Sequence, residues 1–170
     1  MRETITMSDY VVVFDVGVQG YQTWRYAAAP IVFAIVMAGF AVLPSSYLSR
    51  FGRPSPGFYR LVIALAATAL LAHGVQLLTE TRREYNSLST ALRTKHYSVV
   101  EGTVADFVPG GPGGHGDETF RVGVVRFRYS AAMITSAFHR TKPYGGPIRD
   151  GVNVRIASVN GALVRVEVRE

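Results

Sequence analysis

The sequence predicts a membrane protein of the α + β class. A two-helix transmembrane hairpin and a helical stalk are expected to precede a small antiparallel β-barrel of OB-like or SH3-like size. Three observations predict this fold. Residues 26–43 and 61–79 contain no charged side chain. Residues 80–95 contain strong helix formers and neither Gly nor Pro. From Tyr97 onward the apolar residues recur with a period of two, which is typical of strands.

Transmembrane helices are predicted over about residues 26–47 and 61–79. At a rise of about 1.5 Å per residue, each uncharged run approaches the roughly 30 Å hydrocarbon core of a bilayer. The alternative is two buried helices in a soluble protein, but such uniformly apolar helices are uncommon in a chain of 170 residues. His73 and Gln76 lie one turn apart in the second run. We expect them to hydrogen-bond to the first helix or to a partner subunit, because one His and one Gln make no proton relay.

The predicted organisation has four parts. A lead-in covers residues 1–24, the hairpin 25–79, the stalk 80–96 and an extramembrane β-domain 97–170. The lead-in does not resemble a cleavable signal peptide, because its apolar core is short and is followed by Asp15. Three alternatives stay open for these residues: a short strand, an interfacial segment or a disordered segment. Two spans place both termini on the same side of the membrane. The side stays open because the Lys and Arg residues on the two sides nearly balance.

The stalk carries a narrow apolar seam with a seven-residue repeat. The seam consists of Leu78, Thr81, Tyr85, Leu88 and Leu92. Such spacing is typical of a helix that packs along one face, as in a coiled coil. The stalk is therefore expected to pack on another part of the protein, with a dimeric stalk as the alternative.

The β-domain is predicted to contain five or six short strands. They are expected over residues 99–108, 118–122, 125–129, 132–138, 152–159 and 162–168. Asn160-Gly161 between the last two strands is a strong signal for a type I′ hairpin turn. In residues 118–129, Phe120, Val122, Val125, Phe127 and Tyr129 are expected to form one buried face, with Arg121, Arg126 and Arg128 pointing outward. Closure into a barrel is favoured because it removes exposed edge strands.

Charge and composition exclude several function classes. The net charge is +6, but from His96 onward nine Lys and Arg stand against seven Asp and Glu. The β-domain therefore carries only a weak positive charge, which argues against nucleic-acid binding. The remaining basic residues lie near the predicted membrane surface, as snorkelling and lipid headgroups favour. The chain has no cysteine, so thiolate metal sites and cysteine nucleophiles are excluded.

Several short motifs in this layout resemble a known group. They are Val100-Glu101-Gly102-Thr103-Val104, Gly114-His115 before Glu118, Phe120-Arg121-Val122, Val125-Arg126-Phe127-Arg128-Tyr129-Ser130 and Gly145-Gly146-Pro147-Ile148. The chain is similar to uncharacterised bacterial two-span membrane proteins with a C-terminal β-domain, the DUF3592 group (a domain of unknown function). The resemblance implies this architecture and a multi-pass protein of the bacterial inner (plasma) membrane, and it implies no activity. An aromatic residue expected after Ser130 is replaced here by Ala131-Ala132.

The candidate binding residues lie in one loop. Arg140, Lys142, Tyr144 and Arg149 combine three cations and an aromatic ring within a Gly- and Pro-rich segment. Small β-domains often bind partners through such loops. We expect these residues to contact a partner or an anionic headgroup. The equally weighted alternative is a loop that is merely exposed near anionic lipid.

Metal chemistry has weaker candidates, which are His115, Glu118 and His139. Imidazole and carboxylate groups bind zinc and related metals, but nothing in the sequence brings a third ligand close. The glycines of residues 110–116 lack the strand, the helix and the Lys-Ser/Thr pair of a phosphate loop.

The expected function is a membrane-anchored, non-enzymatic binding or accessory module with no cofactor. The alternative is a metal-assisted hydrolase that uses His115, Glu118 and His139. The expected partners are the lipid bilayer, another membrane or envelope protein, or a second copy of the chain bound through the spans or the stalk. Nucleic acid is not expected.

Overall fold

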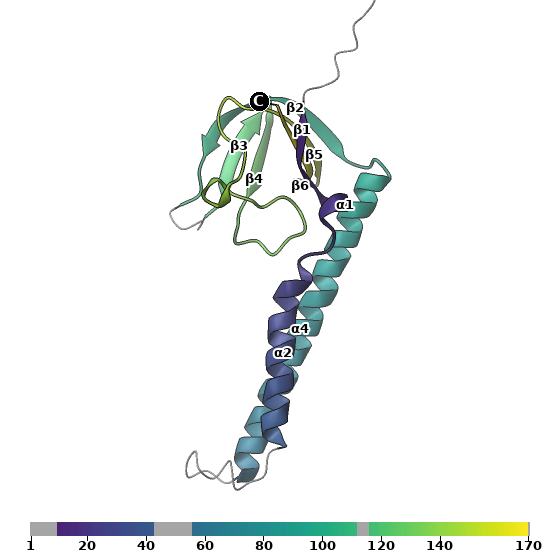
Figure 1. The fold of residues 1–170 in the computed structure, drawn as a ribbon, viewed down its shortest axis with the longest axis vertical. Coiled ribbons are helices and arrows are strands. Elements are labelled where there is room, and N and C mark those ends of the chain that lie inside the picture. Colours follow the sequence, from purple (N-terminus) through teal and green to yellow (C-terminus); the bar gives the residue numbers. More distant parts are fainter. Residues whose placement is uncertain (1–9, 43–55, 112–115, 170) are drawn as a thin grey trace, which may run out of the picture. The chain divides into compact units, whose positions relative to one another are not determined.

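A computed structural model describes residues 10–42, 56–111 and 116–169 of the chain (Figure 1). The chain divides into two compact units. One unit is Gln22–Arg83, and the other combines Met1–Tyr21 with Glu84–Glu170. We call them the helical unit and the β unit. Along the chain the helical unit is therefore inserted into the β unit.

The helical unit consists of α2 (Trp24–Ala41) and most of α4 (Pro56–Arg93). The two helices are long and apolar enough to cross a membrane. Small residues line their contact, since Ala27, Ala34 and Ala67 are all buried. A Cβ atom added at Gly74 would lie 2.5 Å from the side chain of Ile31, so the helices approach closely at this position. Such approach by small residues is typical of helix pairs in lipid.

The outer surface of the helical unit is apolar. Large aliphatic and aromatic side chains on both helices are exposed: Val32, Phe33, Ile35, Val36, Phe40, Leu61, Val62, Leu65, Leu71 and Val75. So many exposed large apolar side chains on one helix pair are unfavourable in water. Gln76, inside the second apolar run, donates a hydrogen bond to Glu80 on its own helix (2.9 Å) rather than to α2. The loop residues 43–55 lie outside the described part of the chain.

The β unit contains one antiparallel sheet of six strands with the order β1-β6-β5-β2-β3-β4. The strands are β1 (Val11–Asp15), β2 (Ser98–Val108), β3 (Glu118–Val122), β4 (Val125–Tyr129), β5 (Asn153–Val159) and β6 (Ala162–Arg169). A short helix, α1 (Val16–Gln19), follows β1, and a 3-10 turn, η3 (Lys142–Tyr144), precedes β5. The long strand β2 pairs with β5 through its first half and with β3 through its second half.

The sheet is open, which corrects the predicted β-barrel. Closure would require the last strand to pair with an edge at the far end of the sheet. The free side of β6 is instead occupied by β1, so β1 and β4 remain as the two edges of the described sheet. The lead-in that contains β1 is thus a structural part of the β unit.

Local sequence signals predicted several strands correctly. The bounds of β3 and β4 are those expected from alternation. The hairpin turn is confirmed, because Asn160 and Gly161 both have positive φ (50° and 83°), as a type I′ turn requires. The predicted strand over residues 132–138 is wrong. There the hydroxyls of Ser130 and Thr135 accept hydrogen bonds from main-chain N–H groups two residues onward, which favours turns over a strand.

The core of the β unit lies on one face of the sheet. Phe120, Val122, Phe127 and Tyr129 are buried as predicted, whereas Val125 is 37% exposed because it flanks the β3–β4 turn. Other buried members are Val104, Phe138, Ile148, Val154, Ile156 and Val166.

Leu163 and Val164 are both buried, although strict alternation along a strand would place neighbouring residues on opposite faces. A register shift between β5 and β6 explains this. Ser158 pairs with Leu163 but Ala157 pairs with Arg165, so Val164 is an extra residue in a bulge.

The end of α4 belongs to this same core. Leu88 is 6% exposed and is a member of the core cluster, and Tyr85 and Leu92 pack against it. Tyr85 also contacts the ring of Tyr21, with 5.7 Å between centroids. The stalk seam is therefore filled, at these three positions, by the protein's own β unit.

Candidate functional site

The segment from Arg140 to Arg149, which we call the basic loop, is a compact turn with an exposed outer surface. Its four predicted binding residues, Arg140, Lys142, Tyr144 and Arg149, are all exposed. Thr141 and Ile148 are fully buried and hold the two ends of the loop against the core. The structure therefore places the four residues on one loop with fixed ends.

Backbone hydrogen bonds stabilise the interior of the basic loop. The carbonyl of Thr141 accepts from the N–H groups of Tyr144 and Gly146, both at 2.9 Å. Gly145 adopts the left-handed conformation (φ 76°) that closes η3. A Cβ atom at Gly146 would lie 2.2 Å from the carbonyl oxygen of Arg140, so only glycine fits there. The loop has little room to rearrange.

Glu118 joins the basic loop to the sheet. Its side chain is fully buried at the start of β3. One carboxylate oxygen accepts a hydrogen bond from the main-chain N–H of Lys142 at 2.8 Å, and the other accepts from the hydroxyl of Tyr129 at 2.5 Å. A buried carboxylate is costly unless it is hydrogen-bonded, so these two donors are needed. Burial, and then the hydrogen bond to Glu118, raise the pKa of Tyr129 above its ordinary value.

The role of Glu118 was not predicted, although the sequence contained a signal for it. Glu118 shares its alternation face with Phe120 and Val122, which are both core residues. A carboxylate on the buried face of a strand indicates an internal anchor rather than a solvated loop acid.

The basic loop is electropositive on its exposed side. Among the described residues, Arg140, Lys142 and Arg149 make no ion pair. The nearest acid in sequence, Asp150, accepts a hydrogen bond from the main-chain N–H of Phe107. The three cations are thus available to an anionic group, with the Tyr144 ring between them in sequence.

The three metal candidates are not brought together in the described structure. His115 lies outside the described residues. Glu118 is already occupied by Tyr129 and Lys142, and Nδ1 of His139 lies 2.9 Å from the carbonyl oxygen of Ala137. In the part of the chain that is described, no group of three His, Cys, Asp or Glu side chains is placed to hold a metal ion.

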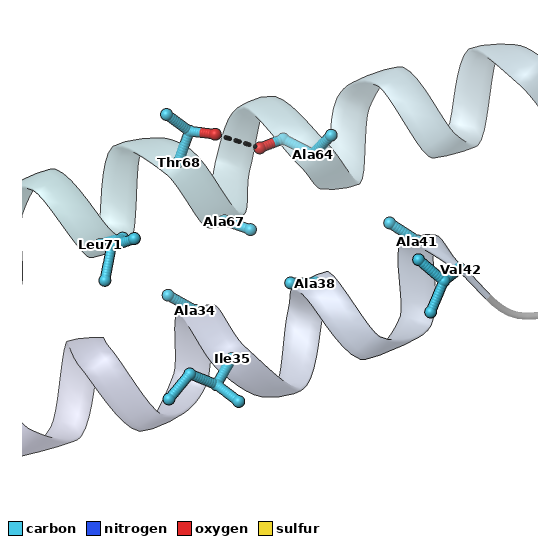
Figure 2. Close-up of a pocket in the computed structure, with 9 residues that line it drawn as sticks. All are labelled: Ala34, Ile35, Ala38, Ala41, Val42, Ala64, Ala67, Thr68 and Leu71. Atoms are coloured by element: carbon cyan, nitrogen blue, oxygen red, sulfur yellow. Dashed lines mark hydrogen bonds between the residues drawn. The ribbon is translucent and has the colours of Figure 1, made fainter.

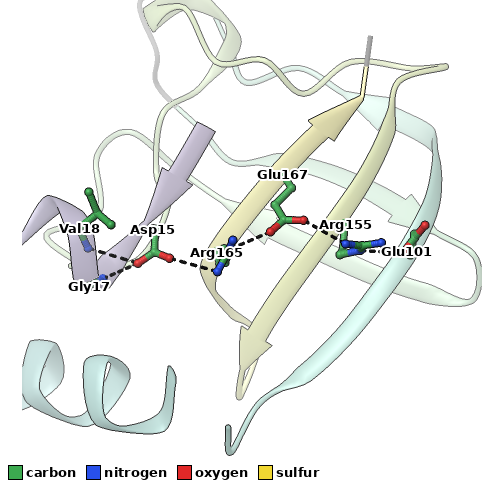
Figure 3. A network of polar contacts seen from close by, with 7 residues as sticks. All are labelled: Asp15, Gly17, Val18, Glu101, Arg155, Arg165 and Glu167. Carbon is green, nitrogen blue, oxygen red and sulfur yellow. Dashed lines mark hydrogen bonds and ion pairs between the residues drawn. The ribbon is translucent and has the colours of Figure 1, made fainter. Parts of the chain in front are cut away.

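A ladder of charges crosses four strands on one face of the sheet (Figure 3). It runs in the order Asp15, Arg165, Glu167, Arg155, Glu101, with N–O distances of 3.7, 2.7, 3.5 and 2.7 Å. The guanidinium of Arg155 also stacks on the ring of Tyr10, 4.7 Å from its centroid. The hydrogen bond from Arg155 lowers the pKa of Glu101. Asp15 also caps α1 by accepting a hydrogen bond from the N–H of Gly17. Its ion pair with Arg165 joins β1 to β6, so the ladder helps to hold β1 on the sheet.

The helical unit contains an apolar cavity of about 370 Å³ between α2 and α4 (Figure 2). Ala34 and Ala38 of α2 point toward Ala67 of α4 across it. The hydroxyl of Thr68, the one polar side chain in the lining, donates to the carbonyl of Ala64 on its own helix. Apart from the acceptor lone pairs of the Thr68 hydroxyl, the described lining therefore offers no polar side chain to a ligand.

Comparisons with known proteins found no matching family model, curated protein or solved structure.

Proposed function

We propose that this protein is a membrane-anchored, non-enzymatic binding module. In this proposal α2 and the first part of α4 cross a bilayer and hold the β unit at its surface. Support comes from the apolar outer surface of the helical unit, where Phe33, Leu65 and other large side chains are more than half exposed. Lipid solvates such a surface, whereas water does not.

The flanks of the helical unit lie in one compartment under this proposal. β1 precedes the helices and β6 follows them, yet the two strands pair. An even number of crossings is needed to bring them together, which two spans supply. We also propose that the chain is related to the DUF3592 group, whose motifs it resembles. That relationship would place it in a bacterial inner membrane.

The basic loop is the proposed binding surface. One observation supports this assignment, which is the way the basic loop is held. Three cations and Tyr144 are exposed on a turn whose base is fixed by the buried Glu118. Because the loop backbone is already ordered, binding of an anionic group has to order only the exposed Arg and Lys side chains. The proposed ligand is therefore an anionic group, carried by a lipid headgroup or by an acidic partner protein.

A photo-cross-linking amino acid at Tyr144, in the full chain and in its native membrane, tests this function. We expect adducts that disappear when Arg140, Lys142 and Arg149 are all changed to Gln. Lipid adducts identify a headgroup, and protein adducts identify a partner. The matched control is the same cross-linker at Val99, which is 54% exposed on β2.

Equal adducts from both positions would contradict the proposal, as would adducts that persist in the triple Gln variant. Protease cleavage in the basic loop, in intact and in opened cells, then shows in which compartment the binding takes place.

A further inference from the structure

β4 is an edge strand whose pairing with its neighbour is regular. It pairs only with β3 in the described sheet and stands at the end of the strand order. Its five residues pair with β3 without any register shift. The opposite edge differs, because β1 has a register shift between Val12 and Phe14 and runs directly into α1. Bulges protect edges from further pairing, so β4 is the edge open to another strand.

The free backbone groups of β4 can be identified from its hairpin. A two-residue turn, Gly123-Val124, joins β3 to β4, so Val122 and Val125 form a hydrogen-bonded pair. Such pairs alternate in an antiparallel ladder, which makes Phe127 and Tyr129 the next inward-bonded residues. The N–H and C=O groups of Arg126 and Arg128 therefore point away from β3, toward the open edge.

A cavity of about 400 Å³ lies along this edge. Apolar side chains dominate its lining, including Phe127, Phe138 and Leu163 from the core and Met133 from the following loop. Met133 is 53% exposed, which is unusual for a large apolar side chain beside a core. An apolar side chain from an added strand, placed next to Phe127, would enter this cavity.

The charges on β4 select the partner. Arg126 and Arg128 are exposed on the outer face, and only Arg128 has an ion pair among the described residues, with Asp117 at 2.8 Å. In an antiparallel pair of two β4 strands centred on Phe127, each Arg126 would face an Arg128. Like charges in opposite positions are destabilising, so a second copy of this edge is disfavoured. Acidic residues in those positions are favoured.

We propose that β4 binds an extended segment of a partner protein by strand addition. The segment places acidic residues opposite Arg126 and Arg128 and an apolar residue between them, in the cavity beside Phe127. Main-chain hydrogen bonds supply the affinity, and the alternating side chains supply the specificity. This surface is separate from the basic loop and does not depend on its function.

Binding of a labelled peptide to the full chain in detergent tests the proposal. The probe is a seven-residue peptide of alternating Glu and Val, compared with one of alternating Lys and Val. We expect the Glu peptide to bind, and Arg126→Glu with Arg128→Glu to weaken it by about tenfold or more. The double variant should gain affinity for the Lys peptide. Lys95→Glu is the control, because it reverses an exposed cation outside both β4 and the basic loop and should leave binding unchanged.

Hydrogen exchange and N-methylation distinguish strand addition from simple charge attraction. The peptide should protect the amides of Arg126 and Arg128 but not change that of Phe127, which already bonds to β3. N-methyl groups on one alternate set of peptide amides should abolish binding, and those on the other set should not. Equal binding of the Glu and Lys peptides, unchanged exchange at Arg126 and Arg128, or no binding of the Glu peptide would each overturn the proposal.

Discussion

Glu118 is a fully buried carboxylate whose hydrogen bonds join three separate segments of the β unit. It lies at the start of β3. It accepts one hydrogen bond from the hydroxyl of Tyr129 at the end of β4 and another from the main-chain N–H of Lys142 in the basic loop. A single side chain thus connects the core to the surface that we propose to be functional.

Gly146→Ala should destabilise the β unit by about 1–3 kcal/mol, because the new methyl group meets backbone atoms that cannot rotate away. The nearest is the carbonyl oxygen of Arg140 at 2.2 Å. Since the chain has no cysteine, a single Val164→Cys substitution reports unfolding of the core through thiol labelling in urea. Gly145→Asn is the control, since it has open space and Asn tolerates positive φ. Equal stability of the two variants would contradict the described packing.

Tyr129 should make the β unit sensitive to alkaline pH. Its pKa is raised in the folded state, so its contribution to stability is present below the unfolded value of about 10 and is lost as pH rises beyond it. The loss can reach about 1.4 kcal/mol per pH unit for one proton. Tyr129→Phe should lower stability at pH 7 by about 1–3 kcal/mol, because one oxygen of the buried Glu118 carboxylate loses its donor. It should also reduce the slope above pH 10.

Urea unfolding from pH 7 to 11, with the same cysteine reporter, measures both effects. Tyr144→Phe removes an exposed phenol and is the matched control. An unchanged alkaline slope in Tyr129→Phe would show that other groups cause the pH dependence.

At the scale of elements, α4 has two different environments along its length. Its first part shows exposed apolar side chains such as Leu65, whereas its last turns bury Leu88 in the core of the β unit. Glu84 in these turns accepts hydrogen bonds from the hydroxyl of Thr135 and the N–H of Ser136, which fixes the irregular segment after β4. The helix end is therefore a structural part of the β unit.

Leu88→Ala should destabilise the β unit by about 2–5 kcal/mol, as large-to-small changes in a core do. Val164→Cys labelling in urea measures it, with Ser87→Ala on the exposed side of the same helix as control. If Leu88→Ala instead changed the oligomeric state and left the stability of the β unit intact, the seam would serve a dimeric stalk.

At the scale of the whole molecule, we propose that the helical unit anchors the protein in a membrane, because its two helices are long and apolar enough to cross one. Leu65→Arg should reduce membrane insertion, since Arg in a span costs up to about 2.5–3.5 kcal/mol, the value at the centre, and less toward the end where Leu65 lies. The measurement is the fraction of full chain that stays with membranes after alkaline carbonate extraction. Val124→Arg is the control, because Val124 is 97% exposed in the β3–β4 turn. In a water-soluble protein Leu65→Arg would improve solubility instead, so the sign of the effect decides between the two environments.

The extent to which sequence predicts this fold follows from the range of each interaction. The bounds of β3 and β4 and the Asn160-Gly161 turn depend on neighbouring residues, and local patterns predicted them. The pairing of β1 with β6 joins residues such as Val11 and Val168, which no local pattern relates, so a closed barrel was expected instead. The four exposed residues of the basic loop were predicted from composition. Their anchor through the main-chain N–H of Lys142 was not, because a backbone donor leaves no trace in the sequence.

The pairing of β1 with β6 also has a consequence for synthesis. The ribosome makes β1 before the helical unit, and β1 has no strand partner among the described residues until β6 emerges. Contacts between residues so distant in sequence form slowly. The nascent chain must therefore keep β1 soluble and unpaired while both apolar helices leave the ribosome. Under the proposed membrane anchoring, insertion of the two helices must deliver the two halves of one sheet to the same compartment.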